Sequence, residues 1–169
     1  AAILQNKPTN FDIDIFQPII TAVEKISGVK YSDNPIPFRV ISDHIRCVCF
    51  AIADGGLPSN EGRGYVLRRI LRRALRYAKK LNINEPFLYR LADNVAASLG
   101  DVYKELLAKN EHIKRVVHAE EERFLQTLDK NIEIFDKIID ELSVSRKNII
   151  SDKDAFLLYD TFGFPLDLT

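Results

Sequence analysis

Apolar residues recur at intervals of three and four positions along most of this chain, and strand-like alternation is rare. Such intervals place the apolar side chains on one face of a helix. The pattern therefore predicts an all-α protein, a multi-helix bundle. We expect helices over residues 14–27, 38–54, 86–99 and 101–142, a short last helix over 152–159, and an arginine-rich helix that follows a loop over 57–64.

Proline and glycine mark most of the predicted boundaries. Pro18 is compatible with the opening turn of the first helix, and Gly28 is a typical helix end. Residues 29–37 form the expected linker to the second helix. Pro86 can open the helix that ends near Gly100.

The segment 101–142 reads as one long helix, straight or bent, with a sustained apolar stripe. A length of about 40 residues is unusual for a helix in a compact domain. One interpretation is a strut between the two halves of a site. The alternative is a coiled-coil contact with a second chain, although the heptad positions drift along the segment.

Basic residues concentrate in one stretch. The chain balances 24 Lys and Arg against 24 Asp and Glu, yet no acidic residue occurs between Glu61 and Glu85. Between the apolar positions of this helix, the remaining face is almost wholly basic. We call its arginines the arginine face: Arg63, Arg68, Arg69, Arg72, Arg73 and Arg76.

Closely spaced guanidinium groups repel one another and need anionic partners. A phosphodiester backbone is one candidate partner. The acidic segment 111–141 of the same chain is the other, because it carries an excess of Asp and Glu. Charge alone leaves the two alternatives open.

Cysteine and histidine give no metal-binding pattern. Cys47 and Cys49 are two positions apart, which points their side chains about 200° from each other on a helix. We therefore interpret both as buried thiols that neither chelate nor bridge. His44, His112 and His118 also lack ligand spacing, and His44 reads as a hydrogen-bonded core or interface histidine.

Length and composition fit one domain or two small helical subdomains, since 169 residues with 46% hydrophobic content can form a packed core. No run approaches the roughly 20 apolar residues of a membrane span. The first residues lack the pattern of a signal peptide. We expect a cytoplasmic protein without a membrane partner.

Four motifs resemble those of alanyl-tRNA synthetases, and the resemblance runs from end to end. They are FRVISDHIR at 38–46, ADG at 53–55, LPSNEGRGY at 57–65 and YDTFGFP at 159–165. The opening residues 1–5 also resemble the end of the helix that carries the third class II motif. The resemblance implies that residues 1–37 close the aminoacylation domain and that residues 38–169 are a helical domain recognising the tRNA acceptor stem.

The same resemblance implies a segment of a ligase that attaches alanine to tRNA(Ala) using ATP. The ATP and alanine site, with its magnesium, would lie upstream, and a zinc-containing editing domain would lie downstream. We therefore expect this chain by itself to be catalytically inactive and to bind neither ATP nor zinc. Its expected partners are the acceptor stem and those missing domains of the same polypeptide.

Asn60 and Asp160 match the family residues that read a G·U wobble pair in the acceptor stem. A wobble leaves the guanine amine unpaired in the shallow minor groove, where a carboxylate can accept its hydrogen bond. An Asn amide can both donate and accept. The arginine face would then hold phosphates. Without the resemblance, Asn60 would be interpreted as a turn or helix-cap residue and Asp160 as a solvated turn carboxylate.

A protein-interaction or dimerisation module is the alternative function, with the arginine face and the long helix binding an acidic surface or a second copy. An independent hydrolase or transferase is disfavoured, because the sequence shows no nucleophile paired with a base. Gly62 and Gly64 alone are too short a motif for a phosphate-binding loop.

Overall fold

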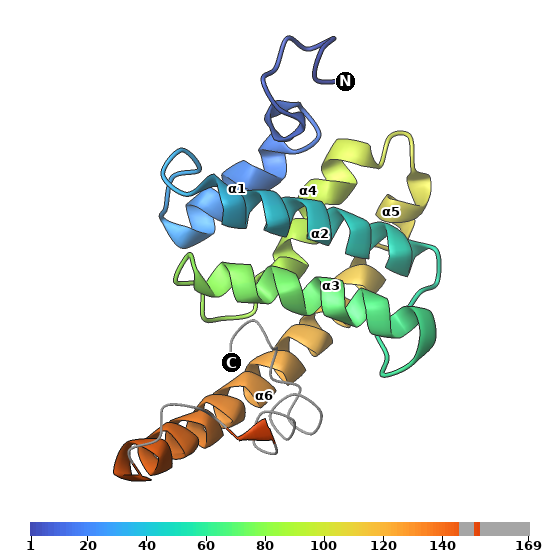
Figure 1. Ribbon diagram of the computed structural model, residues 1–169. Helices are drawn as coiled ribbons and strands as arrows, with labels where there is room; N and C mark the ends of the chain where they lie inside the picture. Colours follow the sequence, from blue (N-terminus) through green and yellow to red (C-terminus); the bar gives the residue numbers. More distant parts are fainter. Residues whose placement is uncertain (146–150, 153–169) are drawn as a thin grey trace. The chain divides into compact units, whose positions relative to one another are not determined.

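A computed structural model describes residues 1–145 and 151–152. Its described residues contain helices and no strand, which confirms the all-α prediction (Figure 1). Within the described residues, one 3-10 turn, η1 (Asn10–Asp12), precedes six α-helices. These are α1 (Gln17–Ser27), α2 (Pro35–Ala53), α3 (Gly62–Lys79), α4 (Leu88–Leu99), α5 (Lys104–Ala108) and α6 (Asn110–Ser145).

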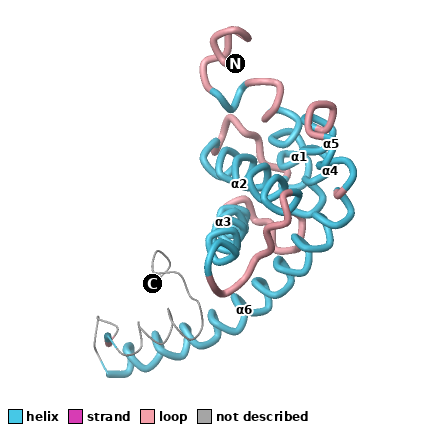
Figure 2. Tube along the Cα trace, turned by 90° about the vertical axis from the view of Figure 1, so that its right-hand side faces the viewer, coloured by secondary structure: helices cyan, strands magenta, loops and turns pink. Residues whose placement is uncertain are grey.

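The chain divides into two compact units, Ala1–Glu121 and Glu122–Thr169, with the boundary inside α6. In the first unit α2 is the central helix, packed against α1, α3, α4 and α5. In Figure 1, α3 runs beside α2 along most of its length, and Figure 2 views α3 nearly end-on, below α2. On another side of α3, Arg68 and Arg72 contact Glu120 of α6. Glu120 belongs to the part of α6 that lies in the first unit.

The core of the first unit is formed by large aliphatic and aromatic side chains from several helices. Burying one such side chain contributes about 1.5–3 kcal/mol to folding. Among the fully buried ones are Ile19, Ile20, Phe38, Ile41, Ile45, Ile52, Leu71, Leu88, Leu91 and Leu106. This packing fixes the rotation of α3 about its own axis, and therefore which of its arginines face inward.

The first two helices begin and end close to their predicted boundaries. Gly28 adopts a left-handed conformation with φ of 71° and donates its N–H to the Glu24 carbonyl at 2.8 Å. The second helix begins at Pro35, three residues earlier than predicted. Prolines fit in a first turn because the N–H groups they lack would have no intrahelical acceptor there.

The predicted long helix is present but starts later. The segment is divided into the short helix α5 and the 36-residue helix α6, which begins at Asn110. The predicted last helix over 152–159 lies outside the described residues except for Asp152. At the other end of the chain, residues 1–7 form turns, including a hydrogen bond from the Gln5 N–H to the Ala1 carbonyl at 3.0 Å.

Burial corrects one prediction about the cysteines. Cys49 is buried, and burial raises the pKa of its thiol to about 12. Cys47 is exposed, so the prediction of two buried thiols was wrong for this residue. The two side chains lie on opposite faces of α2, and only one of those faces packs against the core.

Candidate nucleic-acid interface

The loop that precedes α3 closes tightly onto the first turn of the helix. Ser59 donates its backbone N–H to the Gly64 carbonyl at 3.1 Å and its hydroxyl to the Glu61 carbonyl at 2.7 Å. A Cβ atom at Gly64 would overlap the Ser59 hydroxyl and the Leu57 carbonyl oxygen. Glycine is therefore required at this position of the motif, and the closure holds Asn60 next to the start of α3.

Asn60 is exposed, and its side-chain oxygen accepts a hydrogen bond from the Arg68 guanidinium. The residue at the N-cap of α3 is Glu61, and its side chain makes no capping hydrogen bond. The helix-cap interpretation of Asn60 was therefore wrong. Asp160, the other predicted readout residue, lies outside the described residues.

Two arginines of α3 turn inward and share one carboxylate. Glu120 of α6 is only 3% exposed. Its Oε1 lies 3.0 Å from Arg68 Nε and 3.0 Å from Arg72 Nη2, and it also accepts from Arg72 Nε at 3.1 Å. For these two residues, which we call the inner arginines, the acidic segment of the same chain is a partner, as one of the two sequence-based alternatives anticipated.

A second row of side chains runs along the other side of α3 at intervals of four residues: Tyr65, Arg69, Arg73 and Tyr77. The Arg69 guanidinium lies 5.8 Å from the centre of the Tyr65 ring, and Arg73 lies 5.8 Å from that of Tyr77. Both arginines are exposed. We call these four residues the outer row. It presents two cations, each next to an aromatic ring.

The structure thus separates the six residues of the arginine face. Arg63, Arg69 and Arg73 are exposed, and within the described part of the chain none of the three forms an ion pair. Arg76 is half-buried, like the inner arginines. The sequence could not make this separation, because all six residues lie between apolar positions of the same helix.

His44 of α2 lies close enough to Arg73 to sense its charge. The His44 side chain is 13% exposed, and its Nδ1 lies 3.2 Å from an Asp43 carboxylate oxygen. Burial lowers the pKa of His44, Asp43 opposes that change, and Arg73 lowers the pKa further. Protonation of His44 is therefore less favourable in the folded chain than in the unfolded chain. The neutral His44 ring contributes to the free energy of unfolding above pH 6.5, and this contribution is lost as the pH falls through the lowered pKa.

This coupling predicts that Arg73→Gln raises the pKa of His44, because it removes a nearby positive charge. An NMR titration of the His44 ring protons measures the change directly. Arg90→Gln, on α4, is the matched control and is expected to leave the His44 titration unchanged. An unaltered His44 pKa in Arg73→Gln would contradict the proximity of the two groups.

Glu121 is a structural position that the sequence pattern did not reveal. Its carboxylate accepts the backbone N–H groups of Phe87 and Leu88 at 2.9 and 2.8 Å, and that of Tyr89 at 3.0 Å. These are the unpaired donors at the start of α4. Burial raises the pKa of Glu121, and the three N–H groups oppose that change. The sequence contains a sign of this burial, because Glu121 occupies a position in the apolar stripe of α6, four residues after Val117.

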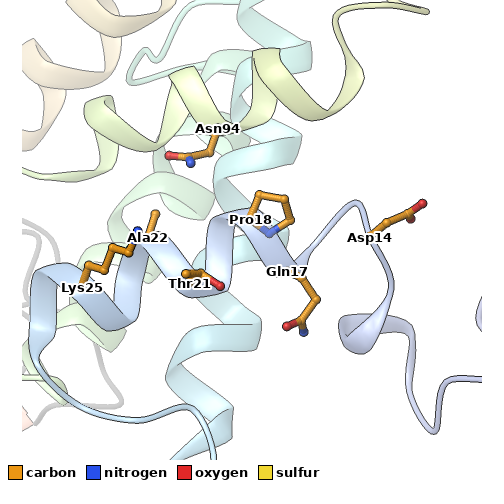
Figure 3. Close-up of a pocket in the computed structure, with 7 residues that line it drawn as sticks. All are labelled: Asp14, Gln17, Pro18, Thr21, Ala22, Lys25 and Asn94. Atoms are coloured by element: carbon orange, nitrogen blue, oxygen red, sulfur yellow. The ribbon is translucent and has the colours of Figure 1, made fainter.

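A surface hollow of about 600 Å³ lies between α1 and α4, away from α3. Figure 3 shows Thr21 and Lys25 on α1 and Asn94 on α4 around it. No residue of the arginine face lines it. Among residues 1–145 and 151–152, no three His, Cys, Asp or Glu side chains gather as a metal site. No helix in this part of the chain is long and apolar enough to cross a membrane.

Comparison with known proteins adds a family to this geometry. A family model described as "tRNA synthetases class II (A)" matches residues 1–169. Curated relatives named alanine–tRNA ligase include those of Chlorobium phaeobacteroides and Halalkalibacterium halodurans, each 53% identical over 99% of this chain. The relative from Bacillus cytotoxicus is 54% identical over the same share. The chain spans 20% of the length of each of these three relatives.

Proposed function

Because the chain belongs to the family of class II tRNA synthetases, we propose that it recognises the acceptor stem of tRNA(Ala) within an alanine–tRNA ligase. The complete ligase would attach alanine to this tRNA using ATP. We assign the recognition role to residues 38–169 and the end of the aminoacylation domain to residues 1–37. ATP, magnesium and zinc chemistry would belong to other parts of the ligase.

The observation that carries this proposal is the outer row beside the loop that holds Asn60. Arg69 and Arg73 are exposed, and the α3 packing fixes their direction. Phosphate contacts position a protein on nucleic acid without reading its sequence. Arg63 lies in the first turn of the same helix, within the motif at 57–65, and adds a third exposed cation. We assign the phosphate contacts chiefly to these three arginines.

Base readout is assigned to Asn60 and Asp160. The minor groove of an RNA helix is shallow and displays base edges and 2′-hydroxyl groups. A carboxylate accepts from the unpaired guanine amine of a G·U pair, and the Asn60 amide supplies a second polar contact. Watson–Crick pairing with cytosine uses one of the two N–H groups of this amine, so a G·C pair offers the carboxylate one donor fewer than a G·U pair.

The prediction for readout is that Asn60→Ala and Asp160→Ala each reduce discrimination between G·U and G·C stems by about 1–3 kcal/mol. Affinity for a G·C stem should change little, because the phosphate contacts remain. Filter binding of two hairpins that differ only in the third base pair measures the ratio. An equal loss for both stems would contradict the readout role.

The proposal as a whole is tested by a salt titration of the unaltered chain with these two hairpins. Tighter binding of the G·U hairpin, together with an affinity that falls as salt rises, is the expected result. Salt-dependent binding that is equal for both hairpins would retain the phosphate contacts and reject base readout. Salt-sensitive dimerisation without RNA binding would instead support the protein-interaction module.

A further inference from the structure

The contact between Asn60 and Arg68 fixes which end of the Asn60 amide is available. An Asn side chain has one accepting oxygen and one donating NH₂ group. A guanidinium can only donate, so the Asn60 atom that faces Arg68 is the oxygen Oδ1. The NH₂ group is therefore on the side of the amide that faces away from Arg68.

Arg68 also forms an ion pair with the buried carboxylate of Glu120. Its side chain is 14% exposed, and its Nε lies 3.0 Å from Oε1 of Glu120, which is 3% exposed. This contact is an ion pair by distance and not a hydrogen bond, so Glu120 holds the Arg68 guanidinium by charge in a site from which water is largely excluded. The Arg68 guanidinium thus contacts Glu120 through Nε and Asn60 through Nη1, and these two contacts restrict its conformational freedom. The orientation of Asn60 is thus set by α6, through Arg68, and not only by its own loop.

We propose that Arg68 and Glu120 are positioning residues that orient the Asn60 amide for base readout, with its NH₂ group presented to RNA. This inference rests on the proposed function. Asn60 then acts as a donor toward an acceptor in the minor groove, such as a base O2 or N3 atom or a 2′-hydroxyl oxygen. Arg68 itself, whose guanidinium contacts both Glu120 and Asn60, is not a main phosphate contact.

A fixed amide orientation also has a thermodynamic advantage. An amide that rotates freely must be ordered when RNA binds, and that ordering reduces affinity. An amide already held by Arg68 avoids this cost for the stem that offers an acceptor. It also disfavours a stem that offers only a donor at the same place. The Glu120–Arg68–Asn60 chain of contacts therefore affects specificity more than general affinity.

The test compares Arg68→Gln with Arg72→Gln, a matched control. Both substitutions remove one arginine from Glu120, but only Arg68 contacts Asn60. We expect Arg68→Gln to lower the ratio of G·U to G·C hairpin affinity about tenfold, as Asn60→Ala does. Arg72→Gln should keep the ratio. The double variant Arg68→Gln/Asn60→Ala should lose no more than either single variant, because one interaction is removed only once.

A second measurement needs no RNA. The side-chain NH₂ resonances of Asn60 should shift in Arg68→Gln and in Glu120→Gln, and stay in place in Arg72→Gln. Arg68→Lys retains a donor and is expected to restore part of the affinity ratio. If Arg68→Gln fails to fold, the affinity ratio of Arg68→Lys is measured in its place, and an unchanged ratio together with unchanged Asn60 resonances contradicts the positioning role.

The outcomes separate this inference from the proposed function. An Arg68→Gln variant that keeps the full affinity ratio, while Asn60→Ala loses it, overturns the positioning role and leaves the proposed function standing. Equal losses in Arg68→Gln and Arg72→Gln also overturn it, since the effect then passes through the helix as a whole. Equal binding of both hairpins by the unaltered chain rejects base readout and the positioning role together.

Discussion

Glu121→Ala is expected to lower the free energy of unfolding by about 3–5 kcal/mol, the largest stability effect of any single substitution considered. The carboxylate of Glu121 accepts the N–H groups of Phe87, Leu88 and Tyr89 at the start of α4. Phe87 and Leu88 are each 1% exposed, so water cannot replace the lost acceptor there. Each buried donor left without a partner costs about 1–3 kcal/mol. Urea unfolding followed by circular dichroism measures the loss.

Two further variants make this result specific. Glu111→Ala removes an exposed carboxylate from the same helix, one that pairs with Lys114 at 3.1 Å, and should cost less than about 1 kcal/mol. Glu121→Gln keeps one accepting oxygen and should fall between the two. A loss in Glu121→Ala no larger than that in Glu111→Ala would contradict the capping role.

The pH dependence of stability provides a check with a definite sign. Burial raises the pKa of Glu121 in the folded chain, so the folded state binds the proton more tightly than the unfolded state. Stability from this group is therefore present at low pH and is lost as the pH rises through the raised pKa. The unaltered chain should lose stability relative to Glu121→Gln over that interval.

The largest effect on RNA binding is expected from the double variant Arg69→Gln/Arg73→Gln. Both side chains are exposed on the outer row, so their removal should leave the fold intact. If they contact phosphates, affinity should fall about 10- to 100-fold for G·U and G·C hairpins alike. The slope of log affinity against log salt should decrease by about two, one for each lost contact. Titrations at several salt concentrations measure both quantities.

Arg72→Gln is the informative comparison for that experiment. Its guanidinium is paired with the buried Glu120, so this substitution should lower the melting temperature and change the salt slope less than Arg73→Gln does. The sequence treats Arg72 and Arg73 as equivalent neighbours. Equal changes in salt slope from the two single variants, with the stability of both unchanged, would reject the division into inner arginines and outer row.

The sequence by itself determined the helical class, the C-terminal ends of α1, α2 and α4 to within one residue, and the family. Helices are local structures, so the three- and four-residue period and the positions of Pro18 and Gly28 were sufficient to predict them. The start of α2 was predicted too late because its prolines were interpreted as linker residues, although prolines are compatible with a first turn. The resemblance of the motif around Asn60 identified the candidate site, and the structure shows that the loop leaves no room for a Cβ atom at Gly64.

Only the tertiary structure decided which arginines are paired within the chain and how Asn60 is held. Arg72 and Glu120 lie 48 positions apart, and their contact depends on how α3 and α6 are rotated where they meet. Helical periodicity defines a polar face but does not say which part of it a distant helix covers. The burial of Glu121 and the exposure of Cys47 have the same origin. Each depends on packing between helices, which the local pattern of a single helix does not encode.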